Sequence, residues 1–356
     1  MEAVPAPFWF VQFFKVVGFV LHMIPMGIWF AGLPVAILCA LWNCERSRFY
    51  ARRMSTQLPV MMALGINFAI VPLLFLQTTY YKAFYTATIL TAWYWLAVIP
   101  ILIVAYYSLY IAAFSGERRG RMILWSLLAS LCLICIAILN TNGLTLMVSS
   151  EHWGTMVSQT SYYGAVLGTA NNLHDPILWI RLATMFGLGL LTAGIWATFD
   201  AHFLKPKNAP ENYRQWTTTL ALAMSIVGVV ILTGTEWYLK TVGGSTVYPY
   251  FGYVLLIASA VLLALLLART RASGAAIVGV AATLQFLALA SFGIIRQIGQ
   301  NAGMAKFVDV ATLPERVQWD TLIAFLVCFL LGVGVIIWMV AQCVKCSSAT
   351  MTEAQS

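Results

Sequence analysis

The chain has 356 residues, of which 61% are hydrophobic and only 9% are charged, and its net charge is +8 at pH 7. A soluble domain carries about 25% charged residues. With a mean hydropathy of +0.86, the composition excludes an ordinary water-soluble protein and indicates a multi-pass membrane protein. The positive charge is not evidence of nucleic-acid binding, because Lys and Arg collect on the cytoplasmic loops of membrane proteins.

Nine apolar segments of roughly 20 residues or more are predicted to be transmembrane helices. The expected fold is an all-α, polytopic helix bundle in which residues 1–356 form a single integral-membrane domain. The tripeptide Gly-Ile-Trp occurs in the first and fifth segments, which suggests a weak internal repeat of residues 10–147 and 177–296. The predicted spans are 10–43, 57–80, 86–114, 122–147, 177–203, 216–238, 249–268, 275–296 and 320–343.

Basic residues alternate between the predicted loops, and this alternation predicts the topology. The positive-inside rule places the basic loops in the cytoplasm, so we expect the N-terminus outside and the C-terminus inside. Two outer loops, 148–176 and 297–319, are long, polar and aromatic, and we expect them to contact a partner on the outer side. The basic residues of the first, third, fifth and seventh loops are Arg46, Arg48, Arg52, Arg53, Arg118, Arg119, Arg121, Lys205, Lys207, Arg214, Arg269 and Arg271.

Ionisable residues inside predicted spans are functional hypotheses by default, because they are costly in a bilayer. His22 lies well inside the first span, and Pro25 is expected to kink the helix beside it. Two interpretations are open: a neutral imidazole bonded to a carbonyl or amide, or an axial haem ligand with Met62 or Met185 as its partner. We expect the cations near span ends to snorkel to the interface and the acids to reach water. These residues are Lys15, Arg181, Arg296, Asp200 and Asp320.

Histidine is too scarce here for a four-helix dihaem cytochrome b, which needs four histidines at membrane depth. The chain has four in all, and only His22 is predicted to lie mid-membrane, so it is the one candidate metal ligand. No catalytic residue is predicted. Cys343 and Cys346 form a CxxC with no second pair and no following His, which excludes a c-type haem attachment and disfavours a zinc site.

A quinone site is a second candidate near the outer ends of the spans. A quinone carbonyl needs a donor such as Arg181 or Arg296, and a quinol hydroxyl needs an acceptor such as Glu236. The residues that we expect to bind a cofactor are therefore His22, Met185, Arg181, Glu236 and Arg296.

The segment from His22 to Phe68 resembles the beginning of subunit I of cytochrome bd quinol oxidases. His22 is followed by the basic stretch ALWNCERSRFYARRM and then by GINFA at 65–69. The resemblance implies a nine-helix fold in the bacterial cytoplasmic (inner) membrane, with the N-terminus outside. It also implies that His22 ligates a b haem.

The chain departs from that family at most of the residues that reduce oxygen. The fifth span has no histidine apart from His202 at its cytoplasmic end, the seventh has no methionine and the third no acid. The Gly-Arg-Gln-Pro-Trp signature is also absent. The long quinol-binding loop of the family is reduced to the stretch KTVGGSTVYP. We therefore expect no oxygen-reductase activity.

Three functions stay open at this point. The first is a membrane subunit of a respiratory electron-transfer complex, which exchanges electrons between quinone and a periplasmic multihaem cytochrome c or anchors that cytochrome; the resemblance implies these partners. One b haem, a quinone or no cofactor at all is compatible with it. The alternatives are a transporter or channel, for which no mid-depth acidic pair is present, and a redox-inert membrane scaffold.

Overall fold

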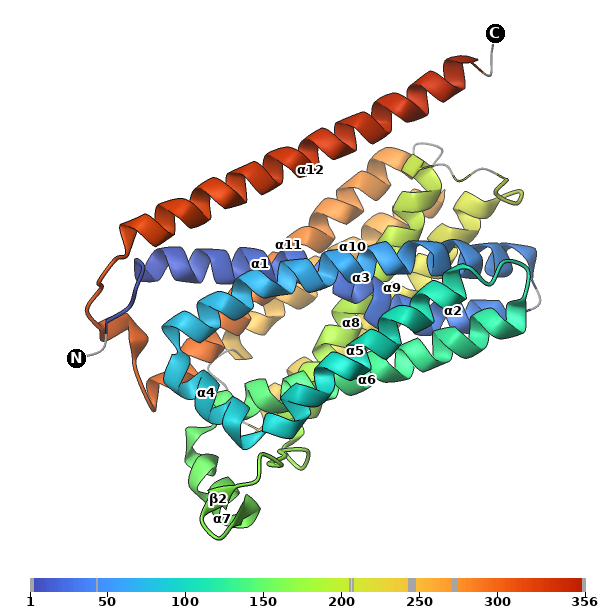
Figure 1. Cartoon of the computed structure of the whole chain (residues 1–356). Coiled ribbons are helices and arrows are strands. Elements are labelled where there is room, and N and C mark those ends of the chain that lie inside the picture. Colours follow the sequence, from blue (N-terminus) through green and yellow to red (C-terminus); the bar gives the residue numbers. More distant parts are fainter. Residues whose placement is uncertain are drawn as a thin grey trace. The chain divides into compact units, whose positions relative to one another are not determined.

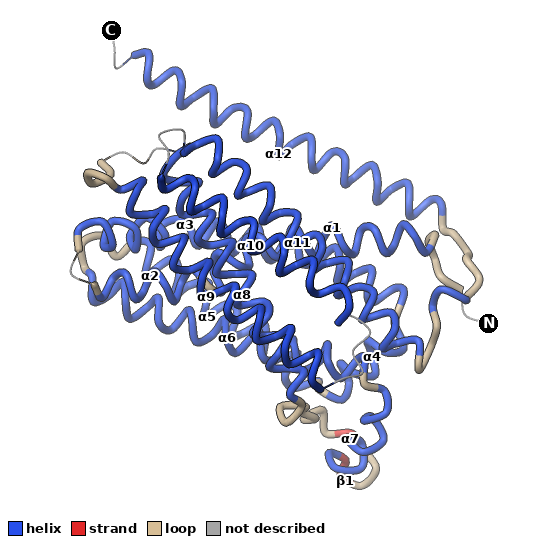
Figure 2. The backbone as a smooth tube through the Cα atoms, turned by 180° about the vertical axis from the view of Figure 1, so that it is seen from behind, coloured by secondary structure: helices blue, strands red, loops and turns tan. Residues whose placement is uncertain are grey.

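The computed structural model describes residues 3–42, 44–204, 206, 208–242, 248–270 and 274–353. Nearly all of them are helical, which confirms the all-α prediction (Figures 1 and 2). The elements are α1 (Phe8–Phe30), α2 (Gly32–Leu41), α3 (Glu45–Thr79), α4 (Tyr81–Leu90), α5 (Ala92–Ala113), α6 (Arg119–Val148), η1 (Ser150–His152), α7 (Trp153–Thr160), β1 (Ser161–Tyr162), β2 (Ala165–Val166), α8 (Pro176–Phe199), the π-helical turn η2 (Asp200–Leu204), α9 (Tyr213–Val242), α10 (Tyr248–Thr270), α11 (Gly274–Ala305), η3 (Val310–Thr312) and α12 (Trp319–Glu353).

Eight helical segments in the described part of the chain are long and apolar enough to cross a membrane. Each coincides with one of the first eight predicted spans. The ninth prediction falls on α12, whose described apolar stretch, Trp319–Val335, is shorter. The protein is thus a multi-pass membrane helix bundle.

Three helices extend well beyond the predicted spans, among them α12, which continues past residue 343 to Glu353. Helix α3 begins at Glu45, so the arginines assigned to the first loop lie on its first turns, and α11 continues to Ala305 into the predicted outer loop. Hydropathy marks where a helix crosses the bilayer, whereas a helix can continue into water because its hydrogen bonds are local.

The first span is interrupted between two helices. Helix α1 continues through Pro25, and the break lies at Ala31, between α1 and α2. Pro34 follows in the first turn of α2, where it cannot donate a hydrogen bond to the Phe30 carbonyl, and this loss explains the break at Ala31. The break at Ala31 lies nine residues after His22, and the kink expected at Pro25 stays a prediction.

The chain divides into two compact units. One comprises residues 1–11 and 311–356, and the other residues 12–310. In the smaller unit, the Val4 N–H donates to the Pro314 carbonyl at 2.9 Å and the Arg316 N–H donates to the Val4 carbonyl at 2.9 Å. These bonds join the segment before α1 to the segment before α12.

Helices α1, α2 and α8 form the centre of the larger unit. In each of the two spans that they make, 72% of the most apolar stretch is buried inside the protein, against 22–44% in the other six spans. Small residues allow this packing: a Cβ added to Gly27 would lie 3.1 Å from the Gly189 Cα, and one added to Gly32 would lie 3.1 Å from the Ala193 Cβ. Gly27 meets Gly189, and the later Gly32 meets the later Ala193. The α1–α2 segment therefore runs parallel to α8.

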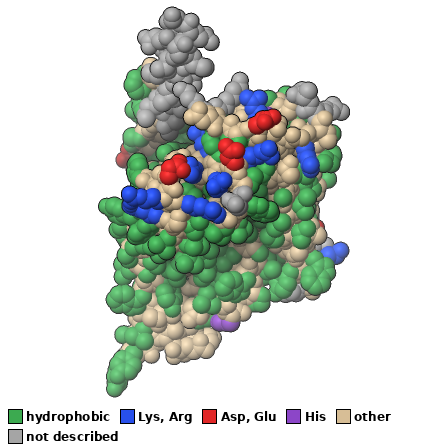
Figure 3. All heavy atoms as spheres, turned by 90° about the vertical axis from the view of Figure 1, so that its right-hand side faces the viewer, with side chains coloured by type: hydrophobic (Ala, Val, Ile, Leu, Met, Phe, Trp, Pro, Cys, Tyr) green, Lys and Arg blue, Asp and Glu red, His purple; other side chains and the backbone are tan. Residues whose placement is uncertain are grey.

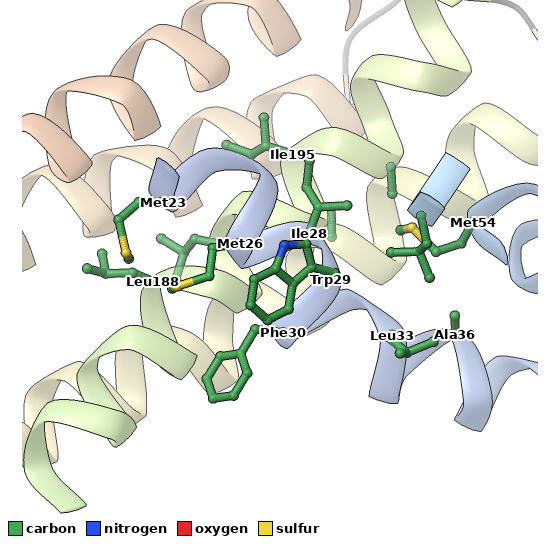
Figure 4. Close-up of a cluster of buried hydrophobic side chains, with 14 of the residues drawn as sticks. Met23, Met26, Ile28, Trp29, Phe30, Leu33, Ala36, Met54, Leu188 and Ile195 are labelled. Carbon is green, nitrogen blue, oxygen red and sulfur yellow. The ribbon is translucent and has the colours of Figure 1, made fainter. Parts of the chain in front are cut away.

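The core around this contact is made of large apolar side chains (Figure 4). Several of them are methionines, whose flexible side chains fill irregular gaps between crossing helices. The labelled members are Met23, Met26, Ile28, Trp29, Phe30, Leu33, Ala36, Met54, Leu188 and Ile195.

Charged side chains gather at one end of the bundle (Figure 3). Arg46 Nε donates to the Glu211 carbonyl at 3.0 Å, and Arg119 Nη2 donates to the Leu41 carbonyl at 2.6 Å. These bonds bring the first, third and fifth predicted loops together, as the alternation of basic loops requires. Which side of the membrane this end faces stays a prediction. Outside the described residues lie Lys205, Lys207 and Arg271.

At the opposite end, the two long predicted outer loops touch each other. Lys306 Nζ lies 3.7 Å from Glu151 Oε1, and the Trp153 and Phe307 rings meet edge to face with centroids 4.8 Å apart. We call residues 148–176 and 297–310 the outer cap. It contains η1, α7 and the hairpin β1–β2, which project beyond the helix ends (Figure 1).

Candidate functional site

His22 contacts the backbone of α3 across the bundle. Its Nδ1 lies 2.8 Å from the Gly65 carbonyl oxygen. A carbonyl can only accept, so Nδ1 carries the proton and the lone pair of the neutral ring lies on Nε2. The predicted hydrogen bond to a carbonyl is therefore present, and it leaves Nε2 available to a ligand.

Gly65 belongs to the GINFA stretch and allows the two helices to approach. A Cβ at this position would lie 3.0 Å from Trp29 Nε1 and 3.6 Å from Pro25 Cγ. The Trp29 N–H has no hydrogen-bond partner in the described structure, although the side chain is buried. A buried unpaired N–H of this kind requires an explanation, such as a bound ligand or water. Sequence reasoning did not select Trp29.

Lys15 lies one to two turns before His22 and is buried. Only 3% of the residue is exposed. Its Nζ donates to Gln300 Oε1 at 3.1 Å and lies 4.2 Å from the centre of the Tyr80 ring. The expectation that Lys15 snorkels to the interface is wrong, because neighbouring side chains enclose its ammonium group.

Arg181 and Arg296 are half-buried and lie close enough to repel each other. The Arg296 guanidinium stacks over the Phe19 ring at 4.4 Å from its centre. Arg181 Nη1 donates to Thr145 Oγ1 at 2.9 Å. Neither forms a salt bridge within the described part of the chain. The structure thus brings these two predicted residues together.

A network of neutral polar groups lies beside the three cations. Gln12 Nε2 donates to the Tyr80 hydroxyl at 3.1 Å, which donates to Asn301 Oδ1 at 2.6 Å. Gln297 Nε2 donates to the same oxygen at 2.7 Å. The sequence analysis missed this network, although the spacing of Gln297, Gln300 and Asn301 places all three on one face of α11.

Of the two remaining predicted residues, Met185 lies near the depth of His22, whereas Glu236 lies away from the two arginines. Met185 lies four residues before Gly189, and His22 lies five before Gly27; since these glycines touch on parallel helices, the two side chains are at similar depth. Glu236 packs toward α10, where its Oε1 would be 3.5 Å from a Cβ at Gly252. Glu236 forms no ion pair or hydrogen bond with either arginine in the described structure.

A buried ion pair lies at the basic end of the bundle. Arg53 Nη2 donates to Asp200 Oδ1 at 2.7 Å and Arg53 Nε donates to Oδ2 at 3.0 Å. Gln57 Nε2 also donates to Asp200, at 2.7 Å, and Trp196 Nε1 donates to Gln57 Oε1 at 2.9 Å. Asp200 is only 3% exposed, so the expectation that it reaches water is wrong.

No group of three or more metal-binding side chains is present in the residues that the structure describes. An axial haem site needs only one or two protein ligands, so this finding leaves the His22 hypothesis open. The side chains of Cys343 and Cys346 and residues 243–247 of the shortened loop lie outside the described residues.

The chain matches no family model and no curated protein. Its fold is similar to a solved structure, that of the bd oxidase from Geobacillus thermodenitrificans, with a TM-score of 0.64 and 10% sequence identity. The match covers 94% of this chain and 97% of that chain. At this identity the likeness concerns the fold. The chain is a multi-pass membrane protein whose fold is similar to that of a bd oxidase chain.

Proposed function

We propose that this chain is an integral membrane subunit of a respiratory electron-transfer complex in the bacterial cytoplasmic membrane. It links the quinone pool to periplasmic cytochromes of the multihaem c type, or anchors them, and it does not reduce oxygen. The fold similarity to a bd oxidase chain supports a respiratory role. The third span has no acid, and the fifth has no histidine apart from His202 at its basic end, which supports the loss of oxygen chemistry.

The observation that carries the proposal is the geometry of His22. Histidines that bind metals usually donate their second ring N–H to a carbonyl or carboxylate, which fixes the tautomer and the ring orientation. His22 donates Nδ1–H to the Gly65 carbonyl at 2.8 Å, so its free Nε2 would hold the iron of a b haem, with Met185 at a similar depth. Such a haem would supply one-electron transfer. The His22–Gly65 bond would orient the ligand, and the apolar core would exclude water.

Arg181 and Arg296 suit a quinone headgroup near the same helices. Each carries several N–H donors, and together they have few protein acceptors, so either could donate to a quinone carbonyl. Glu236 forms no bond to them, so its proposed role as acceptor for a quinol hydroxyl requires a separate part of the site. The neutral network around Tyr80 and Asn301 offers other acceptors.

The outer cap is the proposed docking surface for the cytochrome. Its two segments are tied by the Lys306–Glu151 and Trp153–Phe307 contacts. The hairpin tip presents Tyr163, which is 93% exposed. Exposed tyrosines are typical anchors of protein interfaces.

An optical difference spectrum of the purified protein, reduced minus oxidised, tests the haem. We expect a b-type α-band in the wild type that is lost in His22→Ala. The matched control is His202→Ala, because His202 Nδ1 also bonds a backbone carbonyl, that of Thr198 at 2.9 Å, but lies at the basic end. The control should keep the full band.

Absence of the band from the wild type would contradict haem binding and favour a redox-inert scaffold. In that case His22→Asn should be tolerated at a cost of about 1 kcal/mol, because an amide can donate to the same carbonyl. Quinol-driven oxygen uptake by the purified protein, from a strain without other oxidases, would contradict the absence of oxygen-reductase activity. Crosslinks from a cytochrome to the basic end alone would contradict the docking surface.

A further inference from the structure

We infer that Lys15, Arg181 and Arg296 bind a carboxylate or phosphate group of an anionic molecule between α1, α8 and α11. This inference goes beyond the proposed function, because it requires neither a haem nor a quinone. It depends on the charge balance of the three side chains and on what surrounds them.

The protein supplies mainly neutral partners to these cations. Lys15 contacts the Gln300 amide oxygen and the Tyr80 ring, and Arg296 has the Phe19 ring beneath it. Arg181 has the Thr145 hydroxyl. Among the described residues none of the three forms a salt bridge. Amides, hydroxyls and rings solvate a cation in part, but they do not neutralise it.

The three positive charges also repel one another. Lys15 and Arg296 lie at the same contact of α1 with α11, because Lys15 bonds Gln300 of α11 and Arg296 stacks over Phe19 of α1. The charge of Arg181 also acts on Arg296. Among the described residues, the acid that acts on these cations is Asp175, beside Arg181. Its carboxylate already accepts hydrogen bonds from Ile177 N and Asn172 Nδ2 at 2.9 Å. A lysine can lose its proton on burial, whereas an arginine keeps its charge in proteins. At least two positive charges therefore lie near one another, and Arg181 is the one that has an acid beside it among the described residues.

The chemistry of the missing partner follows from the donors. A guanidinium presents a planar fork of N–H groups that matches the two oxygens of a carboxylate or phosphate. The Arg296 guanidinium has no hydrogen bond to another described residue, so its fork is available to such a group. The same anionic oxygens could belong to a phospholipid headgroup, to a free phosphate ion or to the side-chain carboxylates of a haem.

The test measures the anion bound to the detergent-purified protein and to its variants. Native mass spectrometry reports molecules that co-purify, and thermal unfolding is followed with added inorganic phosphate, short-chain phosphatidylglycerol or phosphatidylcholine of the same chain length. The variant is Arg296→Gln, and the matched control is Arg269→Gln, which removes an exposed arginine at the opposite end of the bundle. Arg296→Lys keeps the charge and tests whether a folded protein retains the site.

We expect an anionic molecule to be bound to the wild type, either co-purified or added, with at least about tenfold weaker binding in Arg296→Gln, because charge-assisted hydrogen bonds are lost. Arg269→Gln should bind as the wild type does, and Arg296→Lys should bind more tightly than Arg296→Gln. Stabilisation by phosphate alone indicates a free ion, stabilisation by phosphatidylglycerol alone indicates a lipid, and haem lost only from Arg296→Gln indicates haem carboxylates.

The inference is overturned if no anion binds selectively, or if binding is the same in Arg296→Gln and in Arg269→Gln.

The direction in which the unfolding temperature changes gives a second readout. Without a bound anion, Arg296→Gln and Lys15→Met relieve repulsion and should raise the unfolding temperature; with one they should lower it. A haem band retained in Arg296→Gln without any bound anion would overturn this inference and leave the proposed function standing. A bound anion without a haem band would do the reverse.

Discussion

At the scale of single residues, polar side chains inside this bundle bond mainly to neutral groups. His22 bonds a backbone carbonyl, Lys15 an amide and Arg181 a hydroxyl. Each of these bonds satisfies a donor, but those of Lys15 and Arg181 do not cancel the charge of the cation. Such an arrangement leaves room for a ligand to complete the site, which is why both proposals lie here.

Gly65 is the residue on which the His22 contact depends most directly. Gly65→Ala places a methyl group 3.0 Å from Trp29 Nε1, so α1 and α3 must shift. We expect a loss of about 1–3 kcal/mol in the free energy of unfolding, measured by thermal unfolding in detergent. The control is Gly234→Ala, where a Cβ meets nothing within 4 Å and helix propensity predicts a gain of about 0.5–1 kcal/mol. Equal effects at the two positions would contradict the close approach.

The Tyr80 hydroxyl joins α1 to α11 through Gln12 and Asn301. Tyr80→Phe leaves both amides without this partner, and we expect a loss of about 1–3 kcal/mol in the free energy of unfolding at neutral pH. A stability equal to that of the wild type would show that water replaces the hydroxyl.

The same residue predicts a pH dependence. Burial raises the pKa of Tyr80 to about 12, against about 10 for a free tyrosine. Folding therefore favours the neutral phenol, and its contribution is complete below about pH 10 and declines as the pH rises toward 12. The stability difference between wild type and Tyr80→Phe should shrink over this window. A constant or growing difference would contradict the raised pKa.

At the scale of elements, the bundle is joined at its basic end by the ion pair between α3 and η2. Asp200 is buried and begins a π-helical turn, a feature often found at functional sites. The pair connects the helix that carries GINFA to the helix that carries Arg181. The helices that carry Gly65 and Arg181 are thus joined by this ion pair.

Loss of Arg53 leaves the Asp200 carboxylate buried with Gln57 as its remaining donor. Because Arg53 itself is partly exposed, we expect Arg53→Ala to cost about 3 kcal/mol, the lower end for a broken buried pair. The neighbouring Arg52, which pairs with the exposed Glu117, is the control, and Arg52→Ala should cost less than about 1 kcal/mol. Thermal unfolding of the two variants measures the difference, and equal losses would contradict it.

At the scale of the whole molecule, the orientation in the membrane is the prediction that most affects function. Gly116 and Gly164 lie in loops at opposite ends of the bundle, and an added Cβ at either meets nothing within 4 Å. A reporter fused at Gly116 should be found in the cytoplasm, and one fused at Gly164 should be found in the periplasm, because basic loops stay on the cytoplasmic side. The reverse result would place the outer cap in the cytoplasm and contradict its proposed partner.

The sequence by itself determined the membrane class, the positions of the spans and the grouping of the basic loops. These properties are local. Any segment with enough consecutive apolar residues can span the bilayer, and the basic residues of each loop indicate on which side that loop lies. It also identified His22, Arg181 and Arg296, because charge or imidazole inside an apolar run is visible without knowledge of the fold.

Only the tertiary structure decided which of these residues meet. Lys15 and Gln300 are 285 residues apart in the chain, and Arg53 and Asp200 are 147 apart. Such partners depend on how helices cross, and here the crossing of α1 with α8 depends on small residues at matching heights, which hydropathy does not register. The same packing buried Lys15 and Asp200, which the sequence had placed at the surface, because span position gives depth along a helix but not the direction in which a side chain faces.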